Sequence, residues 1–155
     1  MQPLDKGLNV AIIQIASRLF PAGFDVSDDA PSTYKDLCAH LDAGNRMLVF
    51  KGGSDHTIYS SPEVNWALRA WHDWCHWRGH HDLTTDGERA VCDMQMQHLR
   101  ELDGSQAERW GRIIRAEIVG QAEYYRLHKR FPDDQRGFAE AYMSCPAAAL
   151  LWPLW

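Results

Sequence analysis

The stretch from Ser61 to Gly79 reads SPEVNWALRAWHDWCHWRG, and it decides the fold that we predict for the chain. It opens with a hydroxyl residue that can cap a helix, a proline suited to the first turn, and an acidic residue near the positive helix end. The glycine stops it. At 100° per residue, the apolar side chains cover an arc of roughly 200°. We therefore predict a helix over 62–78 that is buried over most of its surface.

One narrow stripe of this helix is polar, and it lacks the Lys, Glu, Gln and Ser that usually fill a solvated face. His72 and His76 lie one turn apart in it, so their rings can converge on one point. This is the spacing that metal sites use on helices. The alternative is a solvated or hydrogen-bonded face. The stripe contains Asn65, Arg69, His72, Asp73 and His76.

Helix start and stop signals predict three further helices after this one. The first spans about 84–103, and the second spans 105–130 with Ser105 and Glu108 as a capping box. The third begins at residue 133 or 134 and ends near 145, where a proline follows. The pattern favours a mainly α fold, a helical bundle.

The first 60 residues are the least regular part. A short apolar helix is predicted over 10–20 and another over 32–41, capped by Ser32. Two β-prone runs, 46–50 and 57–59, flank a glycine pair and predict a short hairpin or a structured loop. We expect one compact domain over 1–155, with an irregular part (1–60), a helical core (61–145) and an apolar Trp-rich tail (146–155).

Composition excludes several classes of protein. The chain has 155 residues and a formal charge of −5, and an acidic chain without a basic block is a poor general nucleic-acid binder. No apolar run approaches the roughly 18 residues that a membrane span needs, and the N-terminus lacks a signal-peptide pattern. The four cysteines form no C-x-x-C pair. We interpret them as reduced, buried thiols and expect a cytoplasmic protein without a membrane partner.

The helix predicted over 105–130 contains a carboxylate at a position where an apolar residue is expected. Glu117 falls in the middle of an apolar stripe, with Gln121 one turn later. A buried carboxylate costs several kcal/mol unless it is paired or bound to a cation. The alternatives are an ion pair, for instance with Arg69, or a hydrogen bond from a tyrosine. We predict Glu117 as a metal ligand.

His72, His76 and Glu117 then form a set of two histidines and one carboxylate. Three protein ligands leave coordination positions open for water or substrate, as in catalytic sites. The set suits a divalent zinc, manganese or iron ion. We therefore expect a divalent metal cofactor whose identity the residues leave open.

Neighbouring polar residues supply the remaining candidates. Asp73 and Glu88 are predicted as catalytic bases, or as ligands of a second metal. Glu88 also has a simpler explanation, since an acidic residue in the first turn favours the helix N-terminus. Arg69, one turn before Asp73, can meet an anionic group such as phosphate. Gln121 is the second substrate-binding candidate.

The dyad His72-Asp73 on a mostly apolar helix resembles the HD phosphohydrolase superfamily, over about residues 40–120. The resemblance implies an all-α fold, one or two metals held by a pattern H…HD…D, and hydrolysis of phosphate esters, often of nucleotides. His76 has no fixed place in that pattern. By the same resemblance, the first histidine is His40 or His56, and the last carboxylate is Asp103 or Glu117.

Two other resemblances cover parts of the chain. Residues 72–76 are similar to the H-E-x-x-H motif of zincin metallopeptidases, with Asp73 in place of the glutamate base. Residues 54–135 look like small uncharacterised proteins of tailed phages, which implies the host cytoplasm as the location and brings no activity.

These patterns lead to two functional hypotheses. The first is a metal-dependent hydrolase that acts on a small anionic substrate, a phosphate ester or nucleotide. The alternative is a non-enzymatic helical interaction protein or virion-associated protein, with a structural histidine cluster and the tail as its contact. The tail residues Leu150, Leu151, Trp152, Leu154 and Trp155 are expected to be buried in the body or in a homo-oligomer interface.

Overall fold

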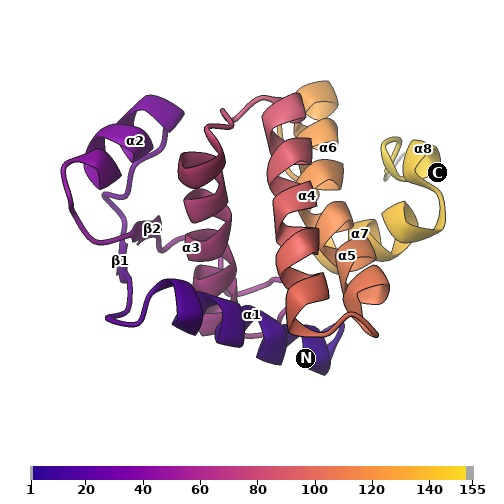
Figure 1. Ribbon diagram of the computed structural model, residues 1–155. Coiled ribbons are helices and arrows are strands. Elements are labelled where there is room, and N and C mark those ends of the chain that lie inside the picture. The colour runs from indigo at the N-terminus through magenta and orange to yellow at the C-terminus, as the bar shows by residue number, and fades with distance from the viewer. Residues whose placement is uncertain (1, 153–155) are drawn as a thin grey trace. The chain divides into compact units, whose positions relative to one another are not determined.

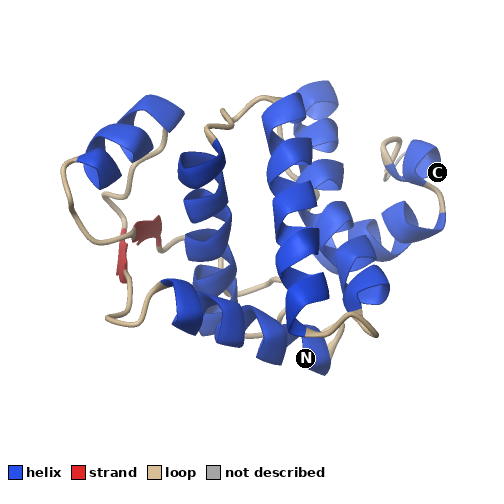
Figure 2. Ribbon diagram, in the orientation of Figure 1, coloured by secondary structure: helices blue, strands red, loops and turns tan. Residues whose placement is uncertain are grey.

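The computed structural model describes residues 2–152, and it confirms the mainly α fold (Figure 2). A two-stranded parallel sheet is the β-structure of this part of the chain. No helix in 2–152 is both long and apolar enough to cross a bilayer. The elements are α1 (Lys6–Leu19), β1 (Asp25–Ser27), α2 (Tyr34–Asp42), β2 (Leu48–Phe50), α3 (Pro62–Gly79), α4 (Thr85–Leu102), α5 (Ala107–Arg115), the π-helical segment η1 (Ala116–Gly120), α6 (Gln121–His128), α7 (Gln135–Ser144) and α8 (Pro146–Ala149).

The chain divides into two compact units, residues 1–83 and 84–155. The division falls at the α3–α4 connection, well after residue 60, where the irregular N-terminal part was expected to end. The single domain that the sequence favours stays a prediction.

Helix α3 is the centre of the first unit. α1, α2 and β2 all contact it (Figure 1). One apolar cluster joins α2 and the strands to the α3 face that carries Ala70, with partly buried tryptophans packed around it. Because so many elements pack on α3, most of its surface is buried, as its wide apolar arc predicts. The buried members of this apolar cluster are Leu37, Met47, Val49 and Ala70.

Of the two predicted alternatives for residues 46–59, a short hairpin or a structured loop, the hairpin is wrong. β2 pairs instead with β1, in parallel, with Asp25 opposite Leu48. Residues 57–59 form a turn, in which Ile58 and Tyr59 are buried. The glycine-rich stretch between the two runs forms a loop whose carbonyls accept hydrogen bonds from α3 side chains, for instance Lys51 O from Trp66 Nε1 at 3.0 Å.

Local capping sets the helix starts, and three differ from the expected ones by one to four residues. α1 begins at Lys6, four residues before the predicted start, because the Asp5 side chain accepts a hydrogen bond from Leu8 N. Thr33, not Ser32, caps α2. The predicted box at Ser105 does not form: that hydroxyl donates to Asp103 at 2.6 Å, and α5 starts without a side-chain cap.

In the second unit, α4 begins after its Thr84 cap and ends at Leu102, as predicted. The single long helix predicted over 105–130 is wrong, because the π-helical η1 interrupts it. A π turn contains more residues than an α turn. Buried positions on successive turns, such as Ile114 and Val119, are therefore five residues apart here. The apolar stripe rotates as a result: Tyr124 is buried, whereas Tyr125 is exposed.

The last described residues pack on α6 and α7. Tyr124 donates to the Trp152 carbonyl at 2.9 Å, and a Cβ on Gly137 would lie 3.3 Å from the Trp152 ring. Leu150 and Trp152 are partly buried. Leu151 is 56% exposed, so it is not buried in the body of this chain, and its burial in a homo-oligomer interface stays a prediction. Leu154 and Trp155 lie outside the described residues.

Candidate metal centre

His72 and His76 face each other on α3. Their Nε2 atoms are 2.9 Å apart, and the ring centroids are 4.5 Å apart with the planes at 83°. His76 is completely buried and His72 is partly buried. The helix holds this arrangement because residues four apart lie one above the other on the same face. The predicted convergence of the two rings is therefore present.

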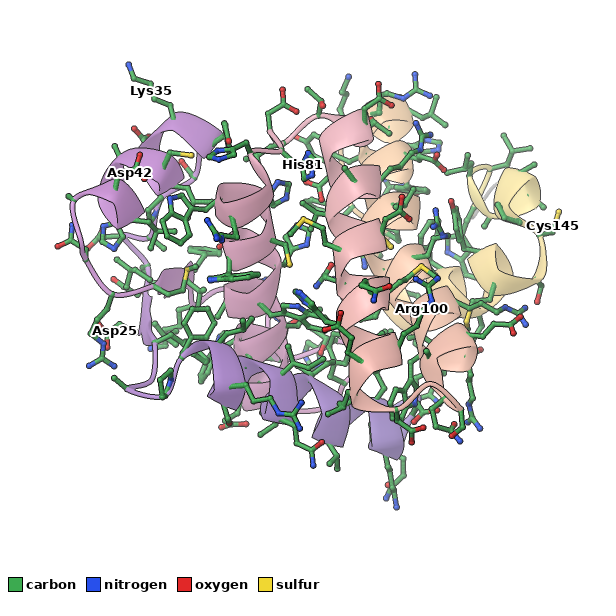
Figure 3. All side chains as sticks on the ribbon, in the orientation of Figure 1. Asp25, Lys35, Asp42, His81, Arg100 and Cys145 are labelled. Atoms are coloured by element: carbon green, nitrogen blue, oxygen red, sulfur yellow. The ribbon has the colours of Figure 1, made fainter. Side chains whose placement is uncertain are left out.

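A solvated histidine face is excluded for His76 by its burial. Its Nδ1 lies 2.8 Å from the carbonyl oxygen of His81, which is labelled in Figure 3. A carbonyl only accepts hydrogen bonds, so Nδ1 carries the proton. In this tautomer the lone pair is on Nε2, which faces Nε2 of His72.

The spacing between the two Nε2 atoms fits either of two arrangements. One is a direct hydrogen bond from His72 to His76. The other is a shared metal ion: two nitrogens about 2.0–2.1 Å from one tetrahedral zinc lie roughly 3.3–3.4 Å apart. The observed 2.9 Å is shorter than that by a few tenths of an ångström, a change that small side-chain rotations can supply.

The rest of the polar stripe is mostly engaged within the first unit. Asn65 donates to Ser54 Oγ at 2.9 Å. Arg69 donates to the carbonyls of Phe50 and Gly52, both at 2.6 Å, with its guanidinium over the Phe50 ring. Arg69 thus clamps the loop after β2, and its predicted contact with a substrate stays a prediction.

Asp73 is partly buried and lies one residue after His72 on α3. Neighbouring Cys75 is completely buried. Burial, together with the charge of Asp73, raises the pKa of the Cys75 thiol to about 12. Burial likewise raises the pKa of Cys92 to about 11. Both stay protonated at neutral pH, which suits the expected buried thiols and makes them poor nucleophiles. The prediction of a buried thiol is wrong for Cys145, which is exposed, and Cys38 is only partly buried.

The other predicted residues belong to the second unit. Glu88 is partly buried in the first turn of α4. Glu117 is partly buried within η1, and π-helical turns are frequent at functional sites. Gln121 follows it at the start of α6 and is buried, with no hydrogen-bond partner for its Nε2.

The candidates that the HD resemblance adds have local contacts. His40 Nε2 lies 2.8 Å from the Arg46 carbonyl. The Asp103 carboxylate accepts from the backbone and hydroxyl of Ser105 at the end of α4. His56 is exposed in the loop before α3. The hydrogen bonds of His40 and Asp103 therefore give these two residues structural roles.

His72 and His76, both in the first unit, belong to a group of side chains that could hold a metal ion. Each of the two histidines offers one imidazole nitrogen as a ligand atom. Sequence reasoning singles out Glu88, in the second unit, as a base or as a ligand of a second metal, although the helix dipole alone can explain an acidic residue there. Glu117 also belongs to the second unit, and its role as a ligand stays a prediction.

Comparison of the chain with protein-family models, curated proteins and solved structures found no match in any of the three.

Proposed function

We propose that this protein is a metal-dependent hydrolase in which His72, His76 and Glu88 hold one divalent metal ion. The observation that carries the proposal is the buried imidazole pair: the Nδ1 of His76 is bonded to a carbonyl, so its Nε2 lone pair is directed at the His72 ring. Metal-binding histidines commonly donate their other ring N–H to a carbonyl or a carboxylate in this way.

Two histidines and one carboxylate leave coordination positions open, which distinguishes catalytic from closed structural sites. The donor set suits zinc, iron or manganese. A bound ion of this kind lowers the pKa of a coordinated water and polarises the group under attack. Glu88, with one of its oxygens as the ligand, adds negative charge that offsets the ion.

Asp73 is the residue that we propose to handle the proton, since it is partly buried and adjacent to a ligand. The substrate class that we propose is a phosphate ester, in line with the HD resemblance of His72-Asp73. Gln121 offers a buried amide with an unsatisfied Nε2, a donor that an oxygen of the substrate could use.

Protein purified without a histidine tag, loaded separately with zinc, manganese or iron(II), tests this function. The assay is hydrolysis of bis(p-nitrophenyl) phosphate and of a nucleotide panel. We expect hydrolysis that needs one of these metals, is lost in His76→Ala, is kept in His56→Ala, and falls about 100-fold in Asp73→Asn. The exposed His56 makes the second variant a matched control.

The competing function is a non-enzymatic helical interaction protein. The direct spacing of 2.9 Å between His72 and His76 favours it, because a hydrogen bond between the two rings explains that distance without any metal. Lack of hydrolysis with all three metals, together with lack of metal binding, would favour this reading over the hydrolase.

A further inference from the structure

The end of α3 has an uncommon backbone. His80 has φ 56° and ψ 40°, the left-handed conformation that glycine adopts most easily. Its N–H approaches Trp77 O at 3.4 Å, and the N–H of His81 donates to His76 O at 3.0 Å. These two bonds define a Schellman motif, in which the left-handed position is usually glycine. Gly79, which was expected to stop the helix, is instead its last residue.

This turn places both backbone groups of His81 on His76. The N–H of His81 donates to the His76 carbonyl, and the His81 carbonyl accepts from His76 Nδ1 at 2.8 Å. The ring is therefore held by a contact whose position depends on the conformation of His80. With the proton on Nδ1, the Nε2 lone pair is available at the His72 side.

A histidine in the left-handed region costs free energy that glycine would not. Histidine tolerates this region better than most residues, and strained backbone of this kind is found at functional sites. His80 itself is exposed, so burial of its side chain does not explain the conformation. The contact from His81 to His76 is what the turn provides.

We propose that the left-handed turn at His80 is a positioning device, which uses the His81 carbonyl to preset the Nδ1–H tautomer and the ring orientation of His76 for metal binding. The role in metal binding rests on the proposed function. The preset tautomer does not, because it is a property of the metal-free protein.

Three variants test the device. His80→Gly keeps the left-handed conformation, whereas His80→Val opposes it, because a β-branched residue is an outlier there. Lys129→Val is the matched control: Lys129 has φ 56° at the end of α6 and its N–H donates to Tyr125 O. It places the same strain at a different helix end. Should His80→Val not fold, His80→Ala replaces it.

Long-range ¹H–¹⁵N correlation spectra of the metal-free proteins at pH 8 report the tautomer of His76. We expect Nδ1–H in wild type, His80→Gly and Lys129→Val, and a mixture of tautomers in His80→Val. Zinc dissociation constants, measured by competition, should rise at least about tenfold in His80→Val alone. Lys129→Val should lower the melting temperature but keep its zinc affinity.

An Nε2–H tautomer in the wild type would overturn the proposal. So would a His80→Val protein with wild-type tautomer and affinity, or equal losses of affinity in His80→Val and Lys129→Val. If wild type binds no zinc, the proposed function fails, and the tautomer comparison still decides whether the turn presets His76.

Discussion

The imidazoles of His72 and His76 meet through their Nε2 atoms, 2.9 Å apart, on one face of α3. This contact is short enough for a hydrogen bond and close to the separation of two ligands on one ion. The carbonyl of His81 fixes the proton of His76 on the far side of the ring. The acceptor nitrogen of the pair is therefore Nε2 of His76.

Glu88 and Glu117 are the two candidates for the third ligand of the proposed metal ion, and substitution distinguishes them. Glu88→Gln should raise the zinc dissociation constant at least about tenfold, the loss that even residues outside the coordination sphere produce. Glu117→Gln should leave it within about twofold, since we place Glu117 outside the ligand set. Competition titration measures both constants. The reverse pattern would restore the set His72, His76 and Glu117.

Arg69 should contribute to stability through the loop after β2. Arg69→Ala removes two hydrogen bonds from a charged group to the carbonyls of Phe50 and Gly52, and we expect a loss of about 1–3 kcal/mol in the free energy of unfolding. Arg78→Ala, at an exposed position on the same helix, is the control and should change it little. Urea titration gives both values; equal effects would argue against the clamp.

The turn of η1 depends on a close approach at Gly120. A Cβ there would lie 3.0–3.1 Å from three carbons of the rigid Tyr142 ring, so Gly120→Ala should lower the free energy of unfolding by about 1–3 kcal/mol. Gly111→Ala is the matched variant, because its Cβ meets only the flexible Met96 side chain. There we expect a near-zero change, since alanine also favours the helix by about 1 kcal/mol. Thermal unfolding distinguishes the two.

Thiol reactivity should follow burial. Cys145 is exposed and should react promptly with an aromatic disulfide reagent at pH 8. Cys75 and Cys92 are buried, with pKa values raised to about 12 and about 11, so few thiolates form and the reagent cannot reach them. We expect both to react only after denaturation. Mass spectrometry of the labelled positions checks this, and rapid labelling of Cys75 in the folded protein would count against its burial.

Local signals predicted the parts of the fold that depend on neighbouring residues. The Ser61 and Thr84 caps place the starts of α3 and α4, because a capping hydroxyl and the amide that it accepts from are three residues apart. Long-range contacts decide the rest. The parallel pairing of β1 with β2 joins residues more than twenty positions apart, and the π turn of η1 accompanies the packing of Gly120 against Tyr142.

The site shows the same division. The spacing of His72 and His76 follows from helix geometry alone, so the sequence predicts their convergence. The burial of His76 depends on other elements that cover α3, and its bond to His81 depends on the left-handed residue His80. Gly79 predicts that the helix stops at residue 79, one position before the left-handed residue His80. The sequence therefore does not reveal the contact between His81 and His76.

The central claim is that the folded chain holds one metal ion at the histidine pair. Protein expressed without a tag in metal-supplemented medium and dialysed extensively should contain about one transition metal ion per chain by elemental mass spectrometry. His76→Ala should contain almost none, and His56→Ala should match the wild type. Metal removal by a chelator should lower the melting temperature of wild type, since a ligand at a hundredfold excess over its Kd stabilises by about 2.7 kcal/mol. Equal metal content in wild type and His76→Ala, or none in either, would contradict the claim.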